Sequence, residues 1–405
     1  MRLSKSRRKF RIVLKSPPPC SYLVLDGGNS NPLTQILMRV SIPHHNYQVS
    51  EFNLYFSRRY LVGLLKFTAR YGFSVGRLLA HLEAFEVRGV ITLEKSDQRN
   101  ALRAVSYELP TVQIISVQHS RFFESVHPHN TWGNPLNVRL ITWGEYHADL
   151  AEMQGRDRSL MIPMGSINLA MHREVARPKT RDIPILVSLK AKGIGVPGSS
   201  QIETEKVARA GSTIQLLKML GLYARARGIA LAFPHDPRED PGIAEDYLKA
   251  FKAISGVECF YVTPSHLARS GSTENWPSVF SAIRSARVFI GVNSSLLWEA
   301  IADSQPTLSV SFGNVLYNQF PCTGPWVLRN PTQHEFESAV DAAMNLELDE
   351  LSRRSEQFSK YLISASRFCA ATELGRFLTA SHMVETLDQA DKLWRATSRV
   401  ESDTS

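Results

Sequence analysis

The segment ARVFIGVNSSLLWEAI holds the residues best suited to bind a phosphate group. A predicted strand, Arg287–Val292, ends at Asn293, Ser294 and Ser295, and Glu299 lies four residues beyond Ser295 on the same face of a predicted helix. Asn and Ser are good helix N-caps, and backbone N–H groups at a helix N-terminus favour a bound anion. We expect Ser294 and Ser295 to hold a nucleotide's phosphates, Glu299 to reach a sugar hydroxyl, and Asn293 to belong to the same donor site. A plain N-cap is the alternative.

A second candidate for phosphate binding is FPHDPRED, residues 233–240, which follows another predicted strand. His235 and Arg238 there could bind a diphosphate, since an arginine can hold a phosphate with two parallel hydrogen bonds. A solvated turn fixed by Pro234 and Pro237 is the alternative.

Two segments in the first half of the chain offer candidate general bases. In VQHSRFF, residues 117–123, a histidine such as His119 has an unperturbed pKa near neutrality, which suits a general base. We expect Gln118 and Arg121 to point into a ligand cleft with it. A polar loop residue is the alternative for His119. In LVLDGGNS, residues 23–30, Asp26 ends a strand. Asp26 is a second candidate base, or it caps the next helix.

Several classes of chemistry are disfavoured by missing motifs. The sequence has no D-x-D pair, no H-E-x-x-H, no phosphate-binding G-x-x-x-x-G-K-[ST] and no G-x-S-x-G, which argues against kinases, P-loop ATPases, zinc hydrolases and serine hydrolases. We expect no metal site and no cofactor. The four cysteines lie far apart without a C-x-x-C pair, which predicts a reducing compartment rather than a disulfide framework.

The elements that must position these residues are short Val- and Ile-rich strands alternating with helices, which is typical of parallel sheets covered on both faces. The predicted strands are Tyr22–Leu25, Gly89–Leu93, Val112–Val117, Arg139–Thr142, Ile183–Leu189, Ile229–Phe233, Val257–Val262, Arg287–Val292 and Pro306–Val310. The clearest predicted helices are Leu61–Tyr71, Val75–Phe85, Thr213–Arg227 and Ala244–Ala253. Such sheets bind ligands at the carboxyl ends of their strands.

The chain is long enough for two domains. We predict an α/β fold of two Rossmann-like domains facing across a cleft. A basic N-terminal arm and the start of the first strand occupy residues 1–15. An N-terminal acceptor domain spans 16–172, a linker 173–182, a C-terminal nucleotide-sugar domain with terminal helices 183–395, and a frayed tail 396–405.

The net charge of +9 is concentrated at the N-terminus, because residues 1–15 carry seven basic and no acidic side chains. A nucleic-acid binder usually spreads its positive charge over a folded face, so we expect no nucleic-acid partner. We find no apolar run long enough to span a membrane and no signal-peptide core. We expect a cytoplasmic protein, with the arm as a means of peripheral attachment.

Taken in order, these segments resemble the bacterial surface carbohydrate (O-antigen or capsule) biosynthesis proteins, glycosyltransferases of the two-domain GT-B type. The likeness covers roughly residues 9–365, through short and degenerate motifs. The matching segments are RKFRIVLKSPPPCSYLVLDGGNS, SEFNLYF, VQHSRF, WGEYHADL, MIPMGSINL and FIGVNSSLLWEAIADSQPTLSVSF. His119 and Ser120 replace the Asn and Gly of the family's turn, and ITLEKSD lacks its Asp-Asn pair.

The resemblance implies a metal-independent transfer from a nucleotide-sugar donor to a surface polysaccharide or a lipid-linked glycan. It adds Glu51 to the candidate bases, beside Asp26 and His119. It also implies acceptor binding by Asn53, Gln118, Arg121 and Glu145. An anionic membrane surface is the implied partner of residues 1–15.

Two other functions stay open. One is transfer of a polyol phosphate from a CDP-glycerol-type donor, for which the sequence offers one histidine-containing phosphate motif rather than two. The other is a catalytically silent GT-B-like scaffold of polysaccharide assembly, which the substitutions at His119 and Ser120 would allow.

Overall fold

The computed structural model describes residues 10–13, 19–25, 32–47, 52–93, 99–118, 137–153, 155–174, 177–178, 180–189, 203–234, 241–263, 279–292, 294–313, 324–363 and 370–403. These residues form two compact units. The first holds the described residues up to 170 and those from 370 onward, and the second holds residues 171–363.

The first unit is built on a six-stranded, fully parallel sheet in the order β3-β2-β5-β6-β7-β8. Its strands are β2 (Tyr22–Leu25), β3 (His44–Tyr47), β5 (Gly89–Leu93), β6 (Gln113–Val117), β7 (Val138–Thr142) and β8 (Met161–Pro163). Every residue of β2, β6 and β7 is buried, as expected where helices cover both faces of a parallel sheet.

Helices α1 to α5 lie between these strands in the chain, and α6 follows the last of them. They are α1 (Pro32–Arg39), α2 (Arg58–Tyr71), α3 (Phe73–Ala84), α4 (Arg99–Glu108), α5 (Glu145–Met153) and α6 (Ile167–Arg173), with the 3-10 helix η2 at Arg158–Leu160. A separate two-stranded parallel sheet joins β1 (Phe10–Val13) to β4 (Phe52–Tyr55). The predicted basic arm therefore leads into a strand, but that strand lies outside the main sheet.

The second unit repeats the same plan with the strand order β11-β10-β9-β12-β13-β14, again all parallel. Its strands are β9 (Ile183–Ser188), β10 (Leu231–Phe233), β11 (Cys259–Tyr261), β12 (Ala286–Gly291), β13 (Thr307–Ser311) and β14 (Val327–Arg329). Its helices are α7 (Glu203–Arg227), α8 (Pro241–Ser255), α10 (Val279–Arg284), α11 (Ser295–Ala302), α12 (Gln333–Met344) and α13 (Leu348–Leu362). The core lies between β9, β10, β12 and β13 and the helices α7, α8 and α12.

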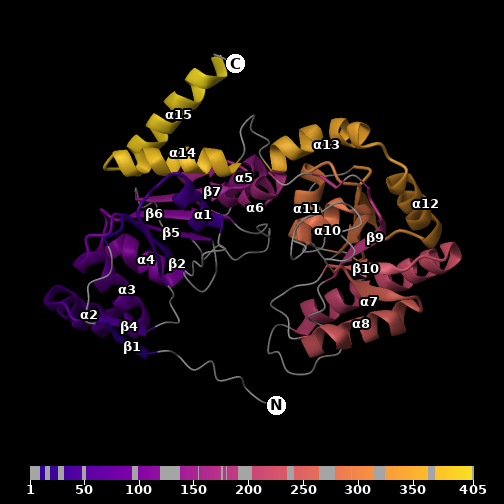
Figure 1. The fold of residues 1–405 in the computed structure, drawn as a ribbon, viewed down its shortest axis with the longest axis horizontal. Helices are drawn as coiled ribbons and strands as arrows, with labels where there is room; N and C mark the ends of the chain where they lie inside the picture. Colours follow the sequence, from indigo (N-terminus) through magenta and orange to yellow (C-terminus); the bar gives the residue numbers. More distant parts are fainter. Residues whose placement is uncertain are drawn as a thin grey trace. The chain divides into compact units, whose positions relative to one another are not determined.

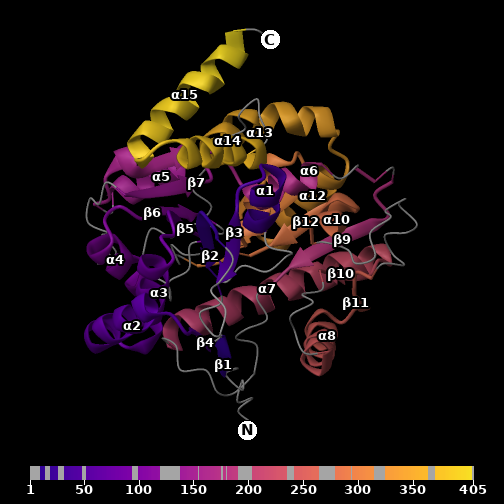
Figure 2. The ribbon, with the colours of Figure 1, turned by 60° about the vertical axis from the view of Figure 1, so that its left-hand side comes forward.

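The two C-terminal helices, α14 (Ala370–Met383) and α15 (Leu387–Asp403), belong to the first unit. In Figures 1 and 2 they lie beside α5 and β7, and α14 packs on α1. The amide of Gln113 in β6 donates to the Ser381 carbonyl at 3.3 Å, and Arg139 in β7 forms an ion pair with Asp388. The sequence predicted that the C-terminal helices belong to the second domain, up to residue 395. In the structure the chain returns, and these helices pack on the first unit.

The predicted α/β fold class is confirmed, because the chain forms two Rossmann-like units, each with a parallel six-stranded sheet. All nine predicted strands are present to within two residues at each end, and the unit boundary at residues 170 and 171 lies just before the predicted linker. Among the described residues, no helix is both long enough and apolar enough to cross a bilayer.

Candidate functional site

The candidate phosphate site lies where β12 ends and α11 begins. β12 is an inner strand between β9 and β13, and its residues Val288, Phe289 and Ile290 are buried. Ser294 has extended backbone angles (φ −110°, ψ 135°), and its Oγ accepts a hydrogen bond from the Leu296 N–H at 3.3 Å. The predicted N-cap is therefore present at the carboxyl edge of the sheet.

The first turn of α11 offers a backbone donor. The Leu297 N–H is bonded to the Ser294 carbonyl at 3.2 Å, and the Leu296 N–H is taken by the Ser294 side chain. The N–H of Ser295, the first residue of the helix, has no partner in the described part of the chain. That N–H and the positive end of the helix dipole suit an anion.

Glu299 lies one turn further along α11 and is only 3% exposed. Glu299 also interacts with another part of the protein. The predicted contact of Glu299 with a ligand sugar therefore stays a prediction, whereas its burial shows that it also belongs to the packing of the helix.

The end of β12 approaches its neighbour β9 unusually closely. A Cβ on Gly291 would lie 2.7 Å from the carbonyl oxygen of Ser188, so only glycine fits there without a shift of the backbone. Ser188 is not identifiable from the sequence, because neither periodicity nor spacing shows which strand becomes the neighbour of β12. This close contact fixes the start of the α11 turn.

His235, Arg238 and Asn293 lie outside the described residues. The strands that precede these residues show where the two segments begin. His235 and Arg238 follow β10, and β9 alone separates β10 from β12. Adjacent strands are about 4.8 Å apart, so the carboxyl ends of β10 and β12 are about 10 Å apart on one edge. Both predicted donor segments therefore begin at the same edge of one sheet.

In the first unit, Gln118 ends β6 and is 2% exposed. Its Oε1 accepts from the Trp143 N–H at 2.7 Å, and its carbonyl accepts from Trp143 Nε1 at 3.1 Å. Gln118 thus ties the end of β6 to the end of β7. The predicted acceptor contact of Gln118 is not tested by this geometry, but its amide oxygen already has a structural partner.

The two other predicted residues of this unit that the structure describes, Glu145 and Asn53, lie on separate elements. Glu145 starts α5 and forms an ion pair with Arg158. Asn53 lies in β4, opposite Arg11 of β1, and so not in the six-stranded sheet. The predicted residues outside the described part of the chain are Asp26, Glu51, His119 and Arg121. The choice of base therefore stays open.

No group of three or more His, Cys, Asp or Glu side chains is arranged to hold a metal ion within the described residues. The polar groups that the structure describes at the β12–α11 junction include serine hydroxyls and backbone N–H groups, and such N–H groups suit an anion. Metal independence itself remains a prediction.

Two parallel six-stranded units, one with a capped helix at the carboxyl edge of its sheet, define a GT-B-type fold with a candidate phosphate site. Among solved structures, the chain is similar to Alr3699/HepE from Anabaena. The complex of that protein with UDP aligns with a TM-score of 0.53 and 10% identity, covering 89% of this chain and 100% of that one. The complex with UDP-glucose aligns with a TM-score of 0.51 and 9% identity over the same shares.

A UDP-GlcNAc 2-epimerase from Methanocaldococcus jannaschii aligns with a TM-score of 0.47 and 11% identity, covering 88% of this chain and 99% of that one. No protein-family model and no curated protein matches the chain. At these identities the likeness to solved structures establishes the fold alone.

Proposed function

We propose that the chain is a glycosyltransferase that moves a sugar from a nucleotide-sugar donor to a surface polysaccharide or lipid-linked glycan, with no obligatory metal ion. The observation that carries the proposal is the capped N-terminus of α11 at the carboxyl edge of β12. It is supported by the shared fold with a protein whose crystal structures hold UDP and UDP-glucose. The sequence resemblance supplies the surface-carbohydrate setting.

In the proposed reaction, the bond between the anomeric carbon of the donor sugar and the diphosphate oxygen breaks. A bond forms between that carbon and an acceptor hydroxyl, whose proton passes to a base. Negative charge grows on the leaving diphosphate, and donors already fixed in position stabilise it most effectively. The Ser295 N–H and the α11 dipole supply this stabilisation, with His235 and Arg238 as proposed cationic partners.

The base in this proposal is Asp26, His119 or Glu51. Asp26 follows β2 and His119 follows Gln118 at the end of β6, so both come directly after strands of the first sheet. Glu51 precedes β4 of the small sheet. Separate substitution of each carboxylate by its amide, and of His119 by Asn, identifies the base as the residue whose loss lowers kcat most with KM little changed.

The proposal is tested by measuring nucleotide release from a panel of UDP-, GDP- and CDP-sugars in the presence of EDTA, with an extract of lipid-linked glycans as acceptor. Acceptor-dependent release with EDTA present is the expected result. Nucleotide release that needs a divalent ion would contradict the proposed metal independence. Transfer of glycerol phosphate from CDP-glycerol instead would favour the polyol-phosphate reaction, and binding without any release would favour the scaffold.

We also propose that residues 1–15 attach the protein to the anionic inner surface of the cytoplasmic membrane, where lipid-linked acceptors lie. Support comes from α2, which directly follows β4, the partner strand of β1. Val62 and Leu65 on α2 are 59% and 75% exposed, and Phe56 just before it is 74% exposed. Exposed apolar side chains near a strongly basic segment are typical of membrane-surface binding.

A further inference from the structure

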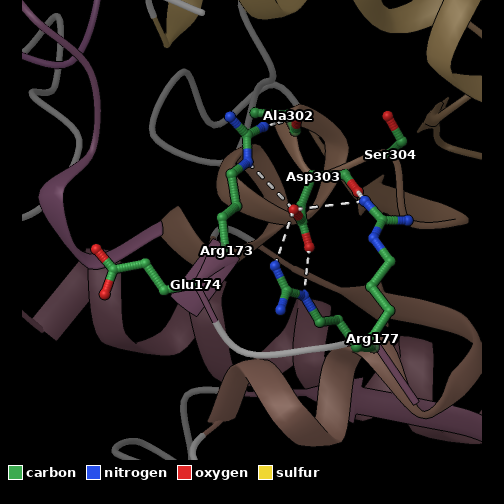
Figure 3. Close-up of a pocket in the computed structure, with 7 residues that line it drawn as sticks. Arg173, Glu174, Arg177, Ala302, Asp303 and Ser304 are labelled. Carbon is green, nitrogen blue, oxygen red and sulfur yellow. Dashed lines mark hydrogen bonds and ion pairs between the residues drawn. The ribbon is translucent and has the colours of Figure 1, made fainter. Parts of the chain in front are cut away.

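Three arginines of the second unit converge on one buried carboxylate. Asp303, which ends α11 and is 3% exposed, accepts from Arg284 Nε at 2.7 Å and Nη2 at 3.2 Å. Arg173 Nε lies 3.3 Å and Arg177 Nη2 3.6 Å from Oδ1 of the same group. Figure 3 shows the guanidinium groups arranged around this carboxylate.

Backbone carbonyls fix the orientation of each guanidinium. Arg173 donates to the Ala302 carbonyl at 2.5 Å, and Arg177 donates to the Asp303 carbonyl at 2.6 Å. Arg284 donates to the His172 carbonyl at 2.6 Å. The first two carbonyls lie at the C-terminal end of α11, where the helix dipole favours cations. The three groups are therefore held in place before any ligand arrives.

The charges of this cluster do not balance. Three guanidinium groups surround a single carboxylate, which leaves two positive charges in excess within the cluster. Glu174 is near, but Figure 3 shows its carboxylate directed away from the arginines. The positive charges of the cluster act together on an anion, so a dianion placed here would gain more than it would beside a single surface arginine.

A cavity adjoins the cluster and has room for such an anion. It has a volume of about 500 Å³ and is lined by Arg173, Glu174, Arg177, Arg284, Ala302, Asp303 and Ser304. Arg284 is only 5% exposed, whereas the Arg173 and Arg177 side chains are 44% and 45% exposed. Within the described residues, Nη1 of Arg173 and Nε and Nη1 of Arg177 have no hydrogen-bond partner. These N–H groups are therefore available to a ligand.

The cavity is separate from the phosphate site of the proposed function. Arg284 ends α10 just before β12, and Asp303 lies shortly before β13, so both are at the amino edge of the sheet. The α11 N-terminus is at the carboxyl edge. Eight helical residues separate the two ends of α11, a rise of about 12 Å.

We propose that this cavity is a second anion site, which binds a small phosphate-bearing molecule through Arg173 and Arg177. The buried ion pair of Arg284 and Asp303 holds these two side chains in position. A phosphate group carries a charge of about −1.5 to −2 at pH 7 and accepts paired hydrogen bonds from guanidinium groups. It therefore matches the two excess charges better than a single carboxylate does.

The test compares the Tm of the full chain in sodium phosphate, in sodium acetate and in sodium chloride at equal ionic strength and pH 7.5. Phosphate at several times its Kd is expected to raise the Tm of the wild-type protein by about 2–4 °C relative to chloride. Arg177→Gln is expected to lose at least half of that rise. Lys249→Gln on α8 removes one positive charge from the same unit outside the cavity and is expected to keep the rise in full.

Because each variant is compared with itself in chloride, a lower Tm of Arg177→Gln does not obscure the result, and Arg173→Gln provides a second test. An undiminished rise in both variants overturns the proposal, as does an equal loss in Lys249→Gln. An equal rise in acetate overturns the preference for phosphate.

The response to UDP distinguishes the second anion site from the donor site of the proposed function. The rise in Tm caused by UDP is expected to be the same in Arg177→Gln as in the wild-type protein, and loss of both responses would overturn a separate site. Absence of any UDP effect in the wild-type protein counts against the proposed function, while the comparison in phosphate still decides this inference.

Discussion

Arg284 and Asp303 form a two-point ion pair, with Nε 2.7 Å from Oδ2 and Nη2 3.2 Å from Oδ1, and both side chains are almost completely buried. The pair joins the end of α10 to the end of α11, so it fixes the two helices that flank β12 in the sequence. Two parallel hydrogen bonds between guanidinium and carboxylate give both strength and direction. The position of α11 therefore depends on its C-terminal end as well as on its cap.

The first prediction concerns this pair. Asp303→Asn removes the charge that three guanidinium groups share, and breaking a buried pair costs about 3–5 kcal/mol. We expect the free energy of unfolding, measured in guanidinium chloride, to fall by about this amount. Asp246→Asn on the exposed side of α8 is the control and should change it by less than about 0.5 kcal/mol. Similar values for the two variants would contradict the role of Asp303.

The second prediction concerns the close approach of β12 and β9. Gly291→Ala places a Cβ 2.7 Å from the Ser188 carbonyl, and such overpacking costs about 1–3 kcal/mol. Gly211→Ala in α7 is the matched control, because its Cβ would meet nothing within 4 Å. There the same substitution should stabilise the protein by about 0.5–1 kcal/mol. Equal effects in chemical unfolding would show that the two strands can separate without cost.

The third prediction separates capping from ligand binding at Ser294. Aspartate is as good an N-cap as serine, so Ser294→Asp should preserve the stability of the protein. It also places a negative charge where the diphosphate is proposed to lie, and we expect the Kd for UDP to rise at least tenfold in calorimetric titration. Ser294→Asn keeps the cap without the charge and should bind UDP much as the wild-type protein does. Equal UDP affinity in all three proteins would show that the diphosphate does not bind at the N-terminus of α11.

Much of the fold could be predicted because buried parallel strands are short continuous apolar runs. Ile183–Ser188 and Ala286–Gly291 are clear examples, with Val and Ile at buried positions and polar residues at the strand ends. By contrast, His44–Tyr47 is polar in sequence and only half-buried for most of its length, so it lacks this signal. An edge strand needs fewer apolar residues, so β3 at the edge of the first sheet is not predicted from the sequence, whereas the edge strand β11 is.

Features of the site that follow from a local rule could be predicted, whereas contacts between residues far apart in the sequence could not. The cap at Ser294 follows from residue type and position alone. The Arg173–Asp303 contact joins residues 130 positions apart, and Met171–Asp182 has the composition of a linker. The return of α14 to the first unit depends in the same way on distant partners such as Gln113 and Ser381. No periodicity identifies such partners.

The fourth prediction concerns membrane attachment. Removing residues 1–9 deletes five basic side chains, each worth about 1 kcal/mol near an anionic surface. Leu65→Asn removes the most exposed apolar side chain of α2. We expect each change to reduce co-sedimentation with phosphatidylglycerol-containing vesicles several-fold. Leu222→Asn, on the second unit and 53% exposed, is the control, and unchanged binding in the first two variants would exclude attachment through this face.

The last prediction concerns pH and rests on His81 of α3. Its ring is fully buried, and neither ring nitrogen has a hydrogen-bond partner in the described part of the chain. Burial, with smaller contributions from the nearby His45 and Arg77, lowers the pKa of His81 to about 3. The aromatic rings around it are those of Tyr47, Tyr55 and Phe85. The folded protein therefore keeps this histidine neutral.

In the unfolded chain His81 has its ordinary pKa of 6.5, so below that pH the unfolded state binds a proton that the folded state does not. The free energy of unfolding must then fall as the pH decreases from 6.5 towards 3, by up to about 1.4 kcal/mol per unit. At pH 4.5 the loss due to His81 amounts to about 2–3 kcal/mol. His81→Phe keeps an aromatic ring in the same contacts and removes the titration. Urea unfolding of both proteins between pH 7 and 4.5 should show a shallower decline in the variant, whereas parallel curves would mean that the His81 site admits water or a proton.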